Sequence, residues 1–146
     1  MRIFSFALLA FTCAGCAVAE SPRAGPMVTT SDVERVCSPV GTAYTRTTMY
    51  FGLTRPMGSI SEAEWQNFLR DEVTPRFPDG LTVLEADGQY RRADGSIQRE
   101  RSKVLVILHD EKPATREALG DLVVSYKKNF AQESVLWETA RVCAAF

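Results

Sequence analysis

The sequence lacks the residue combinations on which most catalytic and metal sites are built. It has one histidine, His109, and it shows no nucleophile motif, no Gly-rich phosphate loop and no metal-ligand spacing. A single imidazole excludes a His-His metal site and a Ser-His dyad with a spare base within one chain. We therefore expect no metal and no cofactor, and the absence of a catalytic motif leaves it undecided whether the protein is an enzyme.

The sequence also has no large excess of positive or negative charge and no long hydrophobic run. The 146 residues carry a formal net charge of -1 and form no basic stripe, so nucleic acid is not an expected partner. The apolar run over 3–11 is too short to span a bilayer as a helix. Because this run follows the basic residue Arg2, it is typical of an export signal.

Two cleavage sites follow this run, and they predict different fates. Ala17–Ala19 has the small-x-small pattern of ordinary signal peptidase, which would release a soluble secreted protein. Ala14–Cys16 resembles a bacterial lipobox, in which Cys16 is acylated and holds the protein on a membrane. We favour the lipidated form, although Cys13 stands where a lipobox usually has an aliphatic residue.

These signals divide the chain into three parts. The signal peptide is 1–19, or 1–15 where Cys16 is lipidated; a flexible tether follows over 20–36, and a single α+β domain over 37–146. The expected location is the bacterial cell envelope, in the periplasm or as an outer-membrane lipoprotein, and otherwise outside the cell. Either route of export leaves Cys37 and Cys143 as a pair of thiols in an oxidising compartment.

Hydrophobic periodicity predicts the element order β-α-β-β-α-β. Strands are expected over 44–53, 81–91, 97–109 and 134–142, and helices over 61–73 and 110–130. Ser61 and Glu64 form a capping box at the start of the first helix. Two right-handed crossovers give a ferredoxin-like sandwich, with an antiparallel four-stranded sheet of order 4-1-3-2 and two helices on one face. The first and last strands are then neighbours, which predicts a disulfide between Cys37 and Cys143.

The turn between the two middle strands sets which side chains the helices cover. A two-residue Asp94-Gly95 loop pairs Leu84 with Leu105. A bulge at Gly88 would invert the two faces beyond it. Without a bulge, the residues expected under the helices are Leu81, Val83, Val104, Val106 and Leu108. Those expected on the uncovered face are Arg46, Thr48, Tyr50, Lys103, Leu105, Ile107 and Glu138.

Five segments of the chain are similar to a known family. They are 45–53 (TRTTMYFGL), 61–69 (SEAEWQNFL), 73–83 (VTPRFPDGLTV), 100–105 (ERSKVL) and 126–136 (YKKNFAQESVL). On these segments the chain resembles the uncharacterised bacterial family catalogued as domain of unknown function 3574. The resemblance implies an exported, often lipid-anchored small protein, and it implies no reaction and no established site.

The uncovered sheet face is the expected place for a ligand, because a pocket needs an apolar floor with a few convergent polar groups. The candidate ligand-binding residues are Arg46, Tyr50, Lys103 and His109. The same face is also suited to a homodimer, or it is merely solvated. For His109, which ends a strand beside Asp110, the alternative is a half-exposed polar residue without a function.

Two hypotheses about function follow. The first is a non-catalytic binding or accessory domain of the cell envelope, held at the membrane through lipid on Cys16. The alternative is a small cofactor-free enzyme that acts on an apolar or aromatic substrate at the open face of a ferredoxin-like dimer, with Arg46, Tyr50 or His109 polarising the substrate. An enclosed cavity lined by Arg46 and Tyr50 would favour the enzyme.

Overall fold

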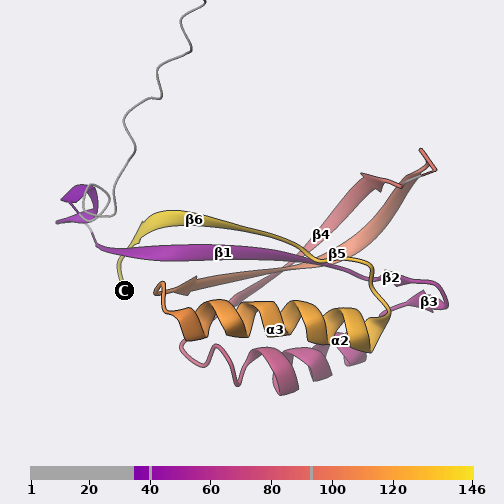
Figure 1. Cartoon of the computed structure of the whole chain (residues 1–146), viewed down its shortest axis with the longest axis horizontal. Coiled ribbons are helices and arrows are strands. Elements are labelled where there is room, and N and C mark those ends of the chain that lie inside the picture. Colours follow the sequence, from indigo (N-terminus) through magenta and orange to yellow (C-terminus); the bar gives the residue numbers. More distant parts are fainter. Residues whose placement is uncertain (1–34, 40, 93) are drawn as a thin grey trace, which may run out of the picture.

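Four long strands and two helices carry the fold in the computed structural model, which describes residues 35–39, 41–92 and 94–146 (Figure 1). The strands are β1 (Thr42–Gly52), β4 (Thr82–Arg91), β5 (Ile97–His109) and β6 (Leu136–Ala144). The helices are α2 (Glu62–Phe68), which continues as the π-helical turn η1 (Leu69–Val73), and α3 (Pro113–Phe130). A short hairpin of β2 (Thr54–Arg55) and β3 (Gly58–Ser59) lies between β1 and α2, where the sequence predicts only a loop.

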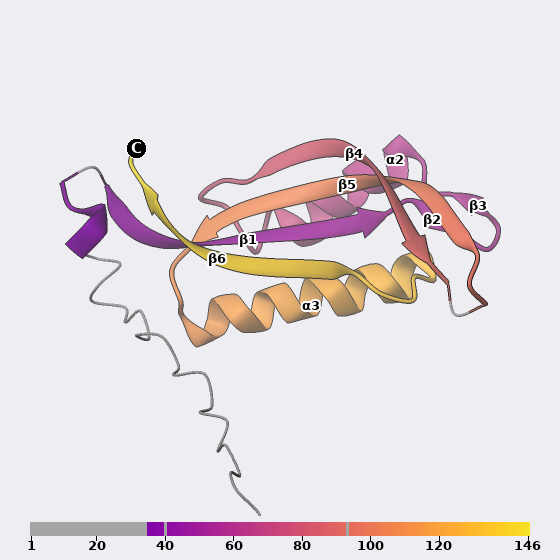
Figure 2. The ribbon, with the colours of Figure 1, turned by 90° about the horizontal axis from the view of Figure 1, so that it is seen from above.

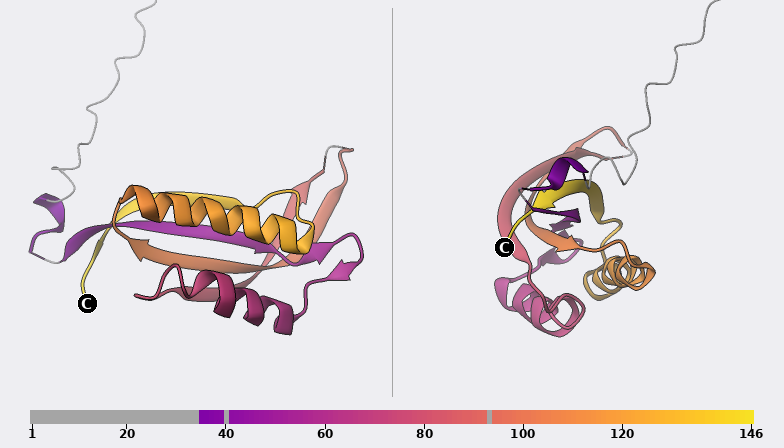
Figure 3. Two further views of the ribbon diagram at one scale, coloured as in Figure 1. Left: turned by 60° about the horizontal axis from the view of Figure 1, so that its bottom comes forward. Right: turned by 90° about the vertical axis from the view of Figure 1, so that its left-hand side faces the viewer.

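The four long strands form one antiparallel sheet in the order β4-β5-β1-β6 (Figure 2). Numbered along the chain and read from β6, this order is 4-1-3-2. Both helices lie against the same face of the sheet, and no described helix covers the other face (Figure 3). The prediction of an α+β fold built on an antiparallel four-stranded sheet is therefore confirmed.

The core lies between the sheet and the two helices. Five aromatic rings pack there with centroids 4.7–6.3 Å apart, and they come from Phe51, Trp65, Phe68, Tyr126 and Phe130. Burying each such side chain stabilises the fold by roughly 2–3 kcal/mol. The hydroxyl of Tyr126 donates to the carbonyl oxygen of Gly52 at 2.8 Å, so α3 is also held to the end of β1.

Local capping determines where the two helices begin. The Oγ atom of Ser61 accepts the amide hydrogen of Glu64 at 3.3 Å, and the Glu64 carboxylate accepts that of Ser61 at 2.8 Å, which confirms the predicted capping box. The hydrogen bonds that the Glu64 carboxylate accepts from the amide and hydroxyl of Ser61 and from Arg55 lower the pKa of Glu64 to about 2. Helix α3 begins with Pro113 after Lys112, three residues after the start predicted at 110, because proline at the first helical position loses no hydrogen bond.

The hairpin between β4 and β5 differs from the prediction by one residue. The amide of Arg92 donates to the carbonyl oxygen of Ser96 at 2.9 Å, and the amide of Gly95 donates to that of Arg92 at 3.0 Å. Gly95 has φ of 85°, the left-handed conformation that closes a three-residue loop with a bulge. The predicted two-residue loop is therefore wrong.

Because the loop is one residue longer than predicted, the side chains of β5 lie on the opposite faces from those predicted. Leu84 pairs with Val104, so the predicted pairing with Leu105 is also wrong. A shift of one residue turns each side chain of a strand to the opposite face. Under the helices lie Lys103, Leu105 and Ile107, not the predicted Val104, Val106 and Leu108. The uncovered face carries Leu84, Val104, Val106, Leu108, Arg46, Thr48, Tyr50, Leu136, Glu138, Ala140 and Val142.

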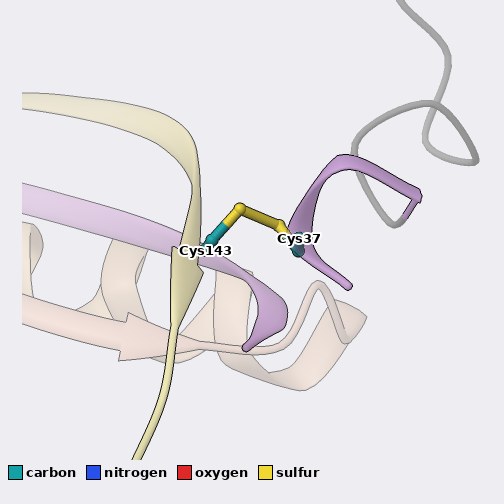
Figure 4. Close-up of a disulfide and its surroundings, with 2 residues drawn as sticks. All are labelled: Cys37 and Cys143. Carbon is teal, nitrogen blue, oxygen red and sulfur yellow. A yellow bond between two sulfur atoms is a disulfide. The ribbon is translucent and has the colours of Figure 1, made fainter. Parts of the chain in front are cut away.

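A disulfide joins Cys37 to Cys143, which confirms the predicted pair (Figure 4). Strand β6 covers Leu136–Ala144 rather than the predicted 134–142, so Cys143 lies inside the strand and not after it. Because Cys143 is paired with Ala43 of β1, the bond ties the turn before β1 to an edge strand of the sheet.

The predicted signal peptide and Cys16 lie outside the described residues. Of the tether expected over 20–36, only Arg35 and Val36 are described, and with Cys37 they form a helical turn. No helix in the described part of the chain is long and apolar enough to cross a membrane.

Candidate functional site

A cleft of about 970 Å³ opens at the end of the sheet where β1 begins and β5 and β6 end, on the left of Figure 1. Strand β4 starts at Thr82, opposite Val106, so β5 runs past the end of its outer neighbour as far as His109. The loop before β4 and the turn before α3 border the resulting gap. Among the residues that they and the start of α3 contribute are Arg76, Phe77, Asp79, Asp110, Lys112 and Thr115.

Arg46 lies on the uncovered face where that face meets the cleft. Its neighbours across the sheet are apolar: Leu108 on β5 and Ala140 on β6. Within the described residues, the guanidinium of Arg46 has no hydrogen-bond or ion-pair partner. The cleft therefore contains a fixed positive charge on an apolar floor.

The other two basic side chains of the cleft are already neutralised. Arg76 contacts the carboxylate of Glu72 at 3.1 Å, and Lys112 forms an ion pair with Asp110. The hydrogen bond from Lys112 holds the pKa of Asp110 below its usual range. Arg46 thus differs from these two basic neighbours, since no carboxylate in the described part of the chain pairs with it.

An aromatic pair forms one side of the cleft beside Arg46. The rings of Tyr44 and Phe146 meet edge to face, with centroids 5.7 Å apart and an interplanar angle of 86°. Val142, opposite Tyr44 on β6, extends this apolar wall. The cleft can therefore hold an apolar group next to the Arg46 charge.

His109 lines the same cleft, but both of its ring nitrogens already have partners. Nδ1 lies 2.6 Å from the carbonyl oxygen of Asp110, so Nδ1 must carry a hydrogen and donate it. In the neutral ring, Nε2 then accepts the hydroxyl hydrogen of Thr47 at 2.8 Å. Thr47 is 0% exposed, so a substrate cannot reach its hydroxyl. Thr47 and His109 are the residue types of a nucleophile and its base, but a substrate has no access to the hydroxyl of Thr47.

A smaller pocket of about 360 Å³ lies between β6 and the start of α3, and His109 lines it as well. The polar groups here bind one another. The hydroxyl of Thr45 donates to Glu111 at 3.0 Å and accepts from Arg141 at 3.2 Å. Within the described ranges, no cluster of three or more His, Cys, Asp or Glu side chains could hold a metal ion.

Lys103 is not on the uncovered face, which corrects the sequence-based assignment. Its side chain is 4% exposed under α2, where the ammonium contacts Glu62 at 2.6 Å and Glu85 at 2.8 Å. Burial alone would lower the pKa of Lys103, but the hydrogen bonds to both carboxylates outweigh it and raise the pKa. Lys103 therefore acts as an ionic link between helix and sheet, and its burial keeps it from a ligand on the uncovered face.

The structure brings two of the four predicted ligand residues together. Arg46 and His109 line one cleft, whereas Tyr50 lies further along the uncovered face and donates to Glu138 at 3.4 Å. Tyr44 was missed, although the alternation of β1 places it on the same face as Arg46. Phe146 follows the last strand and belongs to no pattern that would predict its position.

The chain belongs to the family described as Protein of unknown function (DUF3574), whose model matches residues 46–146. No curated protein matches it.

Several solved structures are similar to this chain. A phage SAM lyase in complex with S-methyl-5'-thioadenosine is 16% identical, with a TM-score of 0.52 over 69% of this chain and 90% of that chain. The same phage lyase in its apo state is 15% identical, with a TM-score of 0.51 over 71% and 92%. CutA from Synechococcus elongatus PCC7942 is 17% identical, with a TM-score of 0.48 over 72% and 82%. At these identities the likeness concerns the fold alone.

Proposed function

We propose that this member of the DUF3574 family is a non-catalytic binding domain of the cell envelope, and that its cleft holds a small ligand with an apolar body and one anionic group. The observation that carries this proposal is the guanidinium of Arg46, which lies on an apolar floor and has no partner among the residues that the structure describes. The aromatic wall of Tyr44 and Phe146 supplies a surface for the apolar body. The volume of about 970 Å³ is large enough for a ligand of ordinary metabolite size.

The strength of such an anchor can be estimated. A hydrogen bond to a charged group contributes about 1.5–3 kcal/mol, which corresponds to roughly 10- to 150-fold in affinity. A planar guanidinium binds carboxylate, sulfonate or phosphate oxygens through two parallel hydrogen bonds. We therefore expect the affinity for an anionic ligand to depend on Arg46, and the affinity for a neutral ligand of the same shape to be almost independent of it.

The side chains that would serve an enzyme are occupied in other ways, and this supports binding over catalysis. Both ring nitrogens of His109 are engaged, and the hydroxyl next to it, that of Thr47, is buried. Lys103 is bound by two carboxylates on the opposite face. A general acid or base must lie within reach of the substrate. Since these side chains are engaged elsewhere, the alternative, a cofactor-free enzyme, has to rely on Arg46 alone as an electrophile.

Two fluorescent probes with similar aromatic bodies test the proposal. Anilinonaphthalene sulfonate carries the negative charge, and N-phenylnaphthylamine lacks it. Arg46→Met removes the positive charge and keeps much of the apolar side chain. We expect this variant to weaken binding of the sulfonate by roughly 10- to 150-fold and binding of the neutral probe by less than about twofold.

The matched control is Arg91→Met, which removes an exposed arginine of β4 outside the cleft. We expect it to leave the affinity for both probes unchanged. An equal effect of Arg46→Met and Arg91→Met on the sulfonate, or an equal loss of both probes in Arg46→Met, would contradict the proposal.

Anchoring at the envelope through lipid on Cys16 is part of the same proposal. The disulfide between Cys37 and Cys143 supports an oxidising compartment, since such bonds form and persist after export. Intact mass of the protein from the native membrane fraction tests this point. We expect the mass of a chain that starts at an acylated Cys16 and has lost two hydrogens to the disulfide. A chain that starts at Glu20 without lipid would contradict the anchor.

A further inference from the structure

We propose that a second copy of this chain packs on the uncovered face of the sheet. The contact would centre on one row of side chains that crosses all four strands: Leu84 on β4, Val104 on β5, Tyr50 on β1 and Leu136 on β6. Leu84 is 52% exposed and Leu136 is 66% exposed, so both ends of the row present apolar surface to water.

The apolar character extends along the strands beyond this row. Val106 lies in the next row, and Leu108 and Ala140 lie in the one after it. Two charged side chains of opposite sign, Arg46 and Glu138, stand on these rows. Because the face carries both signs, two copies of it do not repel each other, as a two-fold contact between identical surfaces requires.

The size of the face agrees with a stable dimer. The four strands are staggered and contain 11, 10, 13 and 9 residues. At about 3.3 Å by 4.8 Å per residue the sheet covers about 680 Å² in projection. A standard interface buries about 800 Å² on each partner, which is of the same order. The sheet alone, without either helix, is therefore wide enough to supply one side of such an interface.

A partner on this face would also complete the ligand site, provided that the proposed function is correct. Arg46, Tyr44 and Val142 lie on the uncovered face at the cleft, where the cleft is open to water. A second copy would exclude water from that side and strengthen the hydrogen bond between Arg46 and an anion, since electrostatic interactions grow as the local dielectric falls.

Sedimentation equilibrium of the purified chain tests the dimer. Leu136→Glu and Leu84→Glu each put a charge on an exposed end of the row, so neither disturbs the core. Val124→Glu is the matched control, because Val124 is 65% exposed on α3, on the other side of the molecule. We expect the unmodified chain and Val124→Glu to have the mass of two chains, and each row variant to raise the dimer dissociation constant at least about thirtyfold.

Two results would overturn the dimer: an unmodified chain that stays monomeric at all concentrations tested, or an equal effect of Val124→Glu and Leu136→Glu. The probes separate this inference from the proposed function. If the dimer forms but Arg46→Met binds the sulfonate normally, the ligand site fails and the dimer stands. If Leu136→Glu becomes monomeric and keeps the ratio of sulfonate to neutral-probe affinity, the closing of the cleft by the second copy is refuted.

Discussion

Breaking the disulfide between Cys37 and Cys143 should remove a large part of the stability of the domain. The two residues are 106 positions apart. In the chain-entropy model, a cross-link that closes a loop of this length lowers the free energy of folding by about 4–5 kcal/mol. A typical domain has a free energy of unfolding of about 5–15 kcal/mol, so the loss would be a substantial fraction of the total.

Urea unfolding followed by circular dichroism measures this loss in two ways. The double variant Cys37→Ala with Cys143→Ala removes the bond and both sulfurs, whereas reduction of the unmodified chain removes the bond and keeps the thiols. Because Cys37 is only 1% exposed, comparing the two separates the cross-link from side-chain packing. We expect both to lose about 4–5 kcal/mol and to agree within about 1 kcal/mol.

The dependence on urea gives a second readout. If the bond acts on the unfolded chain, its removal lets that chain expose more surface, so the m value should rise. A loss below about 1 kcal/mol in both experiments would refute the reasoning. A large loss in the double variant with none on reduction would attribute the stability to packing around Cys37 instead.

Three further predictions concern single side chains. Ser61→Ala should lower the free energy of unfolding, measured with urea, by about 1 kcal/mol. Because the pKa of Glu64 is about 2 in the folded chain and 4.5 in the unfolded chain, the cap stabilises the fold above pH 4.5, and this stabilisation is lost as the pH falls toward 2. The variant should lose less stability over this acid range. Lys103→Met should change stability by no more than about 1 kcal/mol, because the two carboxylates it leaves are exposed and return to water; a loss above about 3 kcal/mol would show that the ion pairs themselves stabilise the fold. Gly95→Ala should cost about 1–2 kcal/mol, since φ of 85° strains any residue with a Cβ atom, and a neutral result would contradict the left-handed conformation of Gly95.

The elements themselves could be predicted because their signals are local. The capping box of Ser61 and Glu64 and the proline at Pro113 mark helix starts within a few residues of sequence. The alternation of β1 placed Arg46 and Tyr50 on the uncovered face correctly, since apolar side chains are concentrated on its other face.

The register of β5 could not be predicted in the same way. Asp94-Gly95 suits a two-residue turn and also a three-residue loop with a bulge, because Gly95 is left-handed in both; the two-residue turn would also need a positive φ at Asp94, which Asp94 does not have. Both faces of β5 are apolar near its end, so burial gives no preference for either register. Lys103 was assigned to the wrong face for this reason.

The cleft exists because β5 extends beyond the start of its neighbour β4. Strand β4 starts opposite Val106 while β5 continues to His109, and no pattern within either strand encodes that offset. The sequence could therefore supply Arg46 and His109 as polar residues of interest. That both residues line the same cleft could be seen only in the three-dimensional structure.

The disulfide also fixes which end of the molecule lies next to the start of the domain. Cys143 borders the opening that contains Arg46, and its bond to Cys37 pins the preceding chain at that same end of the molecule. If the chain is anchored through lipid on Cys16, as we propose, the anchor joins the domain at this end. An amphiphile leaving the lipid surface would then meet the mouth of the site first, without the domain having to turn around.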